Sequence, residues 1–396
     1  MKIQSATASP ASMIENNMSD AARLYEVVFK LVTDALPDLR VEHRKTLAQM
    51  ITGVLRAGNV QFHQIARKLR YPGKKSSLIN RFRRFVKNKN IKVDMMFLPF
   101  AEMILSSLIY EKEIILIIDG SRVGGNCICL MLSVYYNGRA LPLCWLAYKG
   151  KKGHSSSELQ LKLLEMAADL LPEESKITLL GDGEFDSAAV IKWLQEKENW
   201  SYVCRTATNV KVFYEEQWVA LADLPLESGQ DAFFTDLLFT ESEQVGSVNI
   251  MAWWDEKEKK HGHACPPHFF LVTNMSSCSE TQKWYSLRFT IETLFSDIKS
   301  RGFNLNKTRL RHTDRVERLI MVCAISYLFT ISLGVDAVIC GLTEKLVRPA
   351  DSWYDCYYSL FQIGLTYLDH LLNEYWCISA RLTLYPPSKF HYGRII

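Results

Sequence analysis

Two aspartates stand at equivalent places in the chain, each directly after a run of apolar residues. Asp119 follows Ile114–Ile118, and Asp182 follows Ile177–Leu180 and one glycine. Short continuous apolar runs rich in β-branched residues are typical of buried strands. We therefore expect both carboxyl groups at the ends of neighbouring strands. Taken alone, each aspartate serves equally well as a cap of its strand or as a metal ligand.

A predicted helix presents four polar residues on one face. An α-helix advances about 100° per residue, which places residues three, seven and fourteen positions after the first within an arc of about 60°. On the helix predicted for 284–300 these residues are Tyr285, Arg288, Glu292 and Lys299. An ordinary Arg–Glu pair one turn apart, with an incidental lysine, is the alternative interpretation.

The three acids Asp119, Asp182 and Glu292 together form a set of oxygen ligands. Such a set suits Mg²⁺, which binds few carboxylates, keeps several waters and accepts substrate phosphate, with Mn²⁺ as a substitute. Two ions about 4 Å apart activate a water or hydroxyl and stabilise the leaving oxygen in phosphodiester chemistry. Three carboxylates alone would repel one another, so basic neighbours are needed. Arg288 and Lys299 fit that role and can also hold phosphate.

The elements between residues 114 and 204 must position the two aspartates. Their predicted order is strand, strand, strand, helix, strand, helix, strand, which indicates an α/β fold. Asn137-Gly138 predicts a tight hairpin between the second and third strands. The expected strands are 114–118, 127–136, 140–148, 177–180 and 200–204, with helices opening at 155–158 and at Ser187.

The flanking regions differ from this α/β segment in the periodicity of their apolar residues. The first hundred residues have helical periodicity, including a helix 78–86 capped by Ser76-Ser77. Residues 209–278 alternate like strands, and Ser279 with Gln282 predicts the capping box of the helix 284–300. The run Leu319–Val335 is 17 residues long, short of the roughly 20 that cross a membrane, so we expect a buried core helix. The predicted domains are 1–105, 106–208, 209–281, 282–335 and 336–396.

Charge is strongly segregated in a chain of 396 residues with a net charge of only +4. Hydrophobic residues make up 48% of the sequence, which excludes global disorder. Val41–Lys92 carries fourteen basic residues against one acid, a pattern that suits a polyanion such as DNA. Within it, Arg81, Arg83 and Arg84 are the candidate DNA contacts. A solvated basic helix face is the alternative.

The motifs around these acids resemble those of a known family. Tyr285, Arg288, Glu292 and Lys299 reproduce the Tyr-x2-Arg-x3-Glu-x6-Lys signature of a group of bacterial insertion-sequence DDE transposases. Ile117-Ile118-Asp119-Gly120-Ser121 and Gly181-Asp182-Gly183-Glu184-Phe185-Asp186 are similar to the blocks around its first and second aspartates. The resemblance extends from about Arg44 to Arg318.

The resemblance implies a ribonuclease-H-like catalytic core that a β-rich insertion interrupts, with helical regions at both ends. It also implies cut-and-paste transposition with Mg²⁺, in some members through a DNA hairpin. By the same resemblance Asp119, Asp182 and Glu292 are the metal ligands, while Tyr285, Arg288 and Lys299 contact the DNA end. The expected partners are double-stranded DNA, both element ends and target, and a second copy of the chain. The expected location is the bacterial cytoplasm, on the nucleoid.

Two other functions and two other motifs stay open. A catalytically silent DNA-binding repressor and a Mg²⁺-dependent nuclease would use the same fold, although the intact acids argue against the first. Trp253 and Trp254 are candidates for stacking on a flipped base, with a pair in the core or on the face of a hairpin as the alternative. A cluster of His261, His263, Cys265 and His268 has zinc-ligand types, but Pro266-Pro267 splits it and favours a surface turn.

Overall fold

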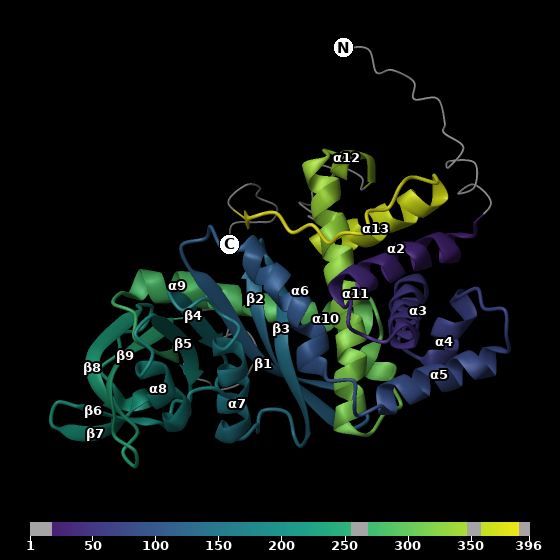
Figure 1. Cartoon of the computed structure of the whole chain (residues 1–396). Helices are drawn as coiled ribbons and strands as arrows, with labels where there is room; N and C mark the ends of the chain where they lie inside the picture. Colours follow the sequence, from purple (N-terminus) through teal and green to yellow (C-terminus); the bar gives the residue numbers. More distant parts are fainter. Residues whose placement is uncertain (1–17, 255–267, 347–357, 388–396) are drawn as a thin grey trace, which may run out of the picture. The chain divides into compact units, whose positions relative to one another are not determined.

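A computed structural model describes residues 18–254, 268–346 and 358–387 (Figure 1). The chain divides into two units. The sheet unit is built on Ile104–Phe295, and the helical unit combines the segment up to Met103 with Ser296–Tyr385. Segments from both sides of the sheet unit in the sequence therefore share one core.

The sheet unit contains a mixed sheet of ten strands among its described residues, in the order β3-β2-β1-β4-β5-β10-β9-β8-β6-β7. The strands are β1 (Ile114–Gly124), β2 (Cys127–Tyr136), β3 (Arg139–Lys149), β4 (Ile177–Gly181), β5 (Trp200–Thr206), β6 (Lys211–Tyr214), β7 (Gln217–Ala220), β8 (Ala232–Phe239), β9 (Val245–Trp254) and β10 (His268–Thr273).

The first five strands follow the predicted order. β1, β2 and β3 form an antiparallel meander, and β1, β4 and β5 are parallel. Asn137 and Gly138 have φ values of 44° and 74°, as a tight turn of the primed type requires, so the predicted hairpin is confirmed. β1 is longer than predicted, because it continues to Gly124 along β2 after its pairing with β4 has ended.

The segment predicted to be β-rich does form strands, and these extend the same sheet. β10 pairs with β5 and with β9, and β9 pairs with β8, all antiparallel. β6 pairs with β8 and β7 at the far edge of the sheet. The core of this unit is made of the apolar faces of β1, β2 and β4, whose side chains are almost entirely buried.

The helices of the sheet unit are α7 (Ser157–Ala168), α8 (Ala188–Gln195), α9 (Cys278–Ser286) and α10 (Thr290–Ser296, the last residue of which belongs to the helical unit). The first three begin at serine caps, whereas α10 follows directly after a 3₁₀ turn. Ser156 and Ser187 accept backbone N–H bonds at the starts of α7 and α8, which confirms both predicted starts. For α9 the cap is Ser277, which accepts from the N–H of Glu280, so the prediction of Ser279 was wrong.

The long helix predicted for 284–300 is interrupted rather than continuous. A 3₁₀ turn, Leu287–Phe289, joins α9 to α10, and a π-helix, Asp297–Arg301, follows α10. The carbonyl of Asp297 accepts from the N–H groups of both Gly302 and Phe303, which widens the last turn. The advance of about 100° per residue, which holds for a regular α-helix, therefore does not apply along the whole of residues 284–300.

The helical unit packs around one long apolar helix. Its helices are α2 (Asp20–Ala35), α3 (Val41–Ala57), α4 (Phe62–Lys68), α5 (Lys75–Lys87), α6 (Val93–Ser107, the last turn of which belongs to the sheet unit), α11 (Thr313–Ile339), α12 (Thr343–Leu346) and α13 (Leu360–Asn373). α3, α5 and α13 all contact α11. α11 is long and apolar enough to cross a membrane, but 83% of its apolar window is buried, as the sequence predicts for a core helix.

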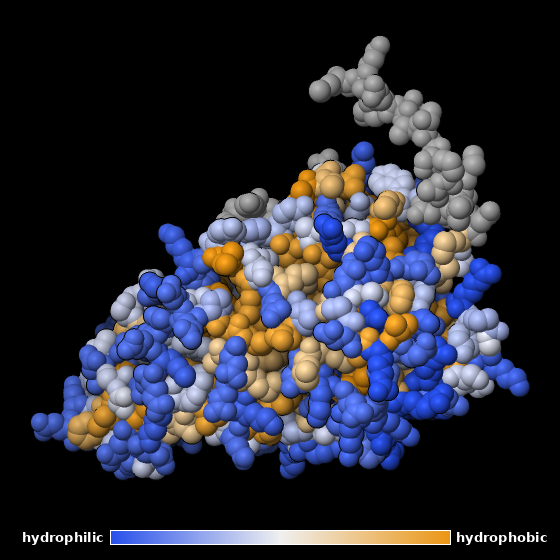
Figure 2. Space-filling view, viewed as in Figure 1, coloured by the Kyte–Doolittle hydropathy of each residue, from blue (hydrophilic) through white to orange (hydrophobic). Residues whose placement is uncertain are grey.

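α5 is amphipathic, with a basic outer face. Leu78, Phe82 and Phe85 are buried, while the surface over α5 is largely hydrophilic in Figure 2. The helix begins at Lys75, and its N-cap, Lys74, makes no side-chain cap bond. The predicted cap at Ser76-Ser77 was therefore wrong, because both serines lie inside the first turn.

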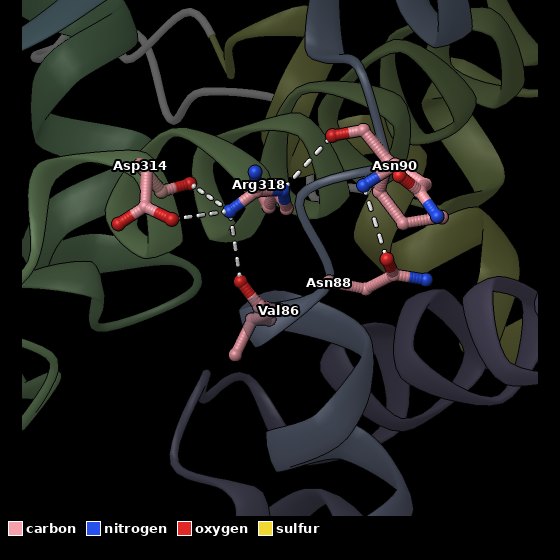
Figure 3. A network of polar contacts seen from close by, with 6 residues as sticks. Val86, Asn88, Asn90, Asp314 and Arg318 are labelled. Carbon is pink, nitrogen blue, oxygen red and sulfur yellow. Dashed lines mark hydrogen bonds and ion pairs between the residues drawn. The ribbon is translucent and has the colours of Figure 1, made fainter.

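Two contacts fix α11 to its neighbours. Gly334 and Gly364 let α11 and α13 touch backbone to backbone, since a Cβ at Gly364 would lie 1.9 Å from the carbonyl oxygen of Thr330. At the other end of α11, the buried Arg318 donates to the carbonyls of Val86 at 3.0 Å and Ile91 at 2.9 Å (Figure 3). It also donates at 2.8 Å to the carboxylate of Asp314.

Candidate active site

The two predicted aspartates lie side by side. The parallel pairing of β1 with β4 ends at Ile118 opposite Gly181. Asp119 is the next residue on β1, and Asp182 directly follows the end of β4. Chain reversal after β4 depends on Gly181, because a Cβ there would lie 2.9 Å from the Cβ of Phe185. The Oδ1 of Asp182 then accepts from the N–H of Glu184 at 3.0 Å, which shapes the turn.

A pocket of about 390 Å³ opens beside these aspartates, wholly within the sheet unit. It collects three of the four polar residues predicted for the helix face, from α9, the 3₁₀ turn and α10. Its lining residues are Asp119, Lys152, Gly153, Asp182, Gly183, Glu184, Arg205, Tyr285, Arg288 and Glu292. Four carboxylates thus share the pocket with three basic side chains.

Asp119 is the most strongly perturbed acid of the pocket. Its side chain is 5% exposed, and its Oδ1 accepts from the N–H of Gly120 at 2.7 Å. Burial, and then the nearby charge of Asp182, raise the pKa of Asp119 to about 7, although Lys152 and Arg288 act in the opposite direction. The negative charge is thus incompletely balanced, which is the condition under which a cation binds well.

Arg288 holds the helix side of the pocket together. Its Nη2 donates to Oε1 of Glu292 at 3.0 Å, and the guanidinium lies over the ring of Phe289, 4.3 Å from the centroid. Arg288 is buried, yet its Nε has no hydrogen-bond partner among the described residues. A donor left unpaired in this way is costly unless a ligand accepts from it.

Tyr285 is buried within an aromatic group that borders the pocket. Its ring contacts those of Trp253, Phe269 and Phe289, with centroids 6.0 to 6.4 Å away. Burial raises the pKa of Tyr285 to about 12, so the hydroxyl stays protonated and can donate a hydrogen bond.

The two predicted base-stacking candidates pack against different rings. Trp253 packs on Phe269 and Tyr285, next to the pocket. Trp254, on the opposite side of β9, packs on His268, with ring centroids 4.9 Å apart. Only Trp253 lies on the side of Tyr285, and both rings are half-buried.

Lys299 is separated from the other three signature residues by the change in helix type. It lies on the π-helix Asp297–Arg301, in the segment that belongs to the helical unit. The angular argument that placed it on the face of Tyr285 assumed a regular α-helix, and that assumption was wrong. Its contact with a DNA end stays a prediction.

The donor types of the pocket fit a divalent cation, but their present arrangement is not a finished site. Asp119 and Asp182 offer adjacent carboxylates, and a nearby cation would relieve the raised pKa of Asp119. Glu292 is engaged with Arg288 instead. Within the described ranges, no group of three acid, histidine or cysteine side chains lies close enough to hold a metal ion.

The three arginines predicted to contact DNA differ in their surroundings on α5. Arg81 is half-buried, donates to the hydroxyl of Tyr71 at 3.4 Å and lies over its ring. Arg83 and Arg84 are exposed, and Arg83 donates to Asn80 at 2.9 Å. The last two are therefore the accessible members of the set.

Three charged residues of the pocket, Lys152, Arg205 and Glu184, were missed as site residues by the sequence analysis. Lys152 stands in a stretch, Gly120–Ser157, that has five basic residues and no acid, and this bias was the available signal. Arg205 follows the buried residues 202–204 of β5. Glu184 comes two residues after Asp182, and from the sequence we expect only a capping or supporting role there. Of the possible zinc cluster, His261, His263 and Cys265 lie outside the described residues, and His268 is bonded to the carbonyl of Gln230.

Comparisons with known proteins give one family match. The transposase DDE domain family matches residues 111–329, more than half of the chain. No curated protein matches. Among solved structures, the chain is similar to the piggyBac transposase synaptic complex with hairpin DNA, with 10% identity and a TM-score of 0.45 over 91% of this chain and 82% of that chain. Since the matched family segment contains every residue that lines the pocket, the chain belongs to the transposase DDE domain family.

Proposed function

We propose that the chain is a DNA transposase that binds the ends of its mobile element and catalyses metal-dependent strand cleavage and strand transfer. The observation that carries this proposal is the convergence of Asp119, Asp182 and Glu292 on one pocket together with Arg288. We also assign the core formed by β1–β5 to the ribonuclease-H-like class. Its antiparallel meander followed by two parallel strands supports that assignment.

In this proposal Asp119, Asp182 and Glu292 hold Mg²⁺ or Mn²⁺. The bound ions supply activation of the attacking oxygen and stabilisation of the leaving oxygen. Arg288 exchanges Glu292 for phosphate, because its fork of donors matches two phosphate oxygens and its Nε is unpaired. The hydroxyl of Tyr285 donates to the DNA end, and Lys299 contacts the same strand.

The reaction needs no co-reactant besides water and DNA. In the first step a water oxygen bonds to the phosphorus at the element end, the bond from phosphorus to the 3′ oxygen breaks, and that oxygen takes up a proton. In the second step the freed 3′ hydroxyl bonds to a phosphorus of target DNA and loses its proton. The bond from that phosphorus to the target's 3′ oxygen breaks, and this leaving oxygen takes up a proton. The number of phosphodiester bonds is conserved in this second step.

End recognition is assigned to the helical unit. Arg83 and Arg84 project from the basic face of α5, and every phosphate that they neutralise releases counterions. Arg81 supports the same helix through Tyr71. Two copies of the chain would hold the two ends of one element, at the nucleoid in the bacterial cytoplasm.

The test uses DNA that flanks the coding region and carries matched inverted repeats. Asp119→Asn, Asp182→Asn and Glu292→Gln should each lower Mg²⁺-dependent cleavage of a labelled end at least 100-fold, while gel-shift binding of the same end is kept. Adding a target plasmid to the wild-type reaction should give joined products. Normal cleavage by any of the three variants would contradict the assigned site, and cleavage without joining would indicate a nuclease.

A further inference from the structure

The loop between β3 and α7 forms a wall of the pocket that lies outside the signature residues. This loop, residues 150–156, is called the Lys152 loop below. Lys152 and Gly153 line the pocket, whereas Lys151 is exposed but does not line it. Gly153 has a φ of +80°, a conformation that other residues rarely adopt, and a Cβ there would meet open space. The turn at Gly153 thus lies at the pocket, and no neighbouring atom crowds it.

Partly buried hydrogen bonds fasten the end of the Lys152 loop. The backbone N–H of Ser155 donates to Oε1 of Glu184. Gln160, which is 1% exposed, donates from Nε2 to Oγ of Ser155 at 2.9 Å and to the carbonyl of Glu184 at 2.8 Å. The loop is therefore tied directly to the turn that follows Asp182.

The carboxylate of Glu184 also reaches the first aspartate's strand. Its Oε2 lies 3.5 Å from the place where a Cβ of residue 120 would stand, next to Asp119. One oxygen of Glu184 thus faces the Lys152 loop and the other faces β1. This carboxylate spans the pocket wall between the two elements.

The charge of Lys152 acts on the proposed chemistry. Lys152 lines the same pocket as Asp119 and Asp182, so its charge lies beside the two carboxylates. The side chain itself is exposed, so DNA can approach it. An exposed lysine beside the buried Asp119 and the half-buried Asp182 is well placed to bind a phosphate that enters the pocket.

We propose that Lys152 contacts a backbone phosphate of the DNA strand that is cleaved, and that Glu184 and Gln160 are positioning residues that hold its loop against the pocket. This inference rests on the proposed function and adds a DNA contact from outside the family signature. The proposed ligand is the phosphodiester backbone, because an ammonium group that contacts a phosphate does not distinguish one base from another.

Lys152→Gln is compared with Lys151→Gln, a matched control one residue away. On end DNA in Mg²⁺, Lys152→Gln should lower kcat/KM for cleavage about 10-fold or more, while Lys151→Gln stays within about 2-fold of wild type. Without metal, the slope of log affinity for the end duplex against log salt should become shallower by about 0.9 for Lys152→Gln alone, the value for one phosphate contact. Equal slopes and equal rates for the two variants would overturn the contact.

The positioning role is tested by rescue and by a double-mutant cycle. Glu184→Ala should impair cleavage about as much as Lys152→Gln, whereas Glu184→Gln should keep most activity, because its amide oxygen still accepts from Ser155. Combining Glu184→Ala with Lys152→Gln should add less than about 2-fold to the loss. Fully multiplicative losses, or no rescue by Glu184→Gln, would overturn the positioning role.

The salt slope separates this inference from the proposed function, because it requires no cleavage. A wild-type protein that binds the end duplex without cutting it would contradict the transposase proposal. The slopes of Lys152→Gln and Lys151→Gln would still decide whether Lys152 contacts phosphate.

Discussion

Replacing Arg318 by methionine should destabilise the helical unit strongly. The guanidinium donates to the carbonyls of Val86 and Ile91, at the C-terminal end of α5 and just beyond it, and both residues are 1% exposed. A buried acceptor left without a donor costs about 1–3 kcal/mol, so the two carbonyls together cost about 2–6 kcal/mol. The buried apolar side chain of methionine recovers about 1 kcal/mol. The expected net loss is about 1–5 kcal/mol.

The effect should be read as a change in the free energy of unfolding. Urea titration of full-length protein, followed by far-ultraviolet circular dichroism, gives the midpoint and slope for Arg318→Met. Arg309→Met is the matched control, because Arg309 is exposed in the same segment and should change stability by less than about 0.5 kcal/mol. A loss for Arg318→Met no larger than that of the control would refute the reasoning.

Three further predictions follow from other contacts. Arg288→Lys should lower the rate of end cleavage about 10-fold or more at unchanged charge, because a lysine cannot reproduce the two-donor fork; a wild-type rate in the labelled-end assay would make Arg288 structural. Burial raises the pKa of Asp336 to about 6, so its contribution favours the folded state at low pH and is lost as pH rises through 6. Asp336→Asn should therefore raise stability by about 1 kcal/mol at pH 7.5, after allowance for its partial exposure, and by almost nothing at pH 4, as measured by thermal melts at both values. Gly364→Ala should lower stability by about 1–3 kcal/mol, opposite in sign to the usual gain inside a helix, since its Cβ would collide with Thr330; an unchanged urea midpoint would show that α13 moves freely.

Local signals predicted the elements that depend on local chemistry. The Asn137-Gly138 turn and the serine cap at Ser187 were both found as expected, because turns and caps are set by a few neighbouring residues. The start of α9 was misplaced by two residues for a simple reason. Ser277 with Glu280 offers the same spacing of a serine and an acid or amide as Ser279 with Gln282, and the helix begins at the first of the two.

Distant contacts decided what the sequence could not predict. The 3₁₀ turn at Arg288 and the π-helix after α10 depend on the packing around a buried guanidinium and on the double acceptor at Asp297. Lys152 enters the pocket because Glu184, 32 residues later in the chain, holds its loop. Neither the interrupted helix nor the position of Lys152 can be predicted from the periodicity or spacing of residues within one segment. The two aspartates, in contrast, were predictable because a shared strand register places them together.

The divided helical unit has a consequence for the order in which a new chain matures. α3 and α5 pack on α11, which leaves the ribosome only after the whole sheet unit. At about 5–20 residues per second, the roughly 190 residues of the sheet unit take about 10–40 s to synthesise. During that time the helices proposed to bind DNA lack their core, although they were made first. A chain that ends early therefore carries a complete catalytic pocket at most, and never a finished DNA-binding surface.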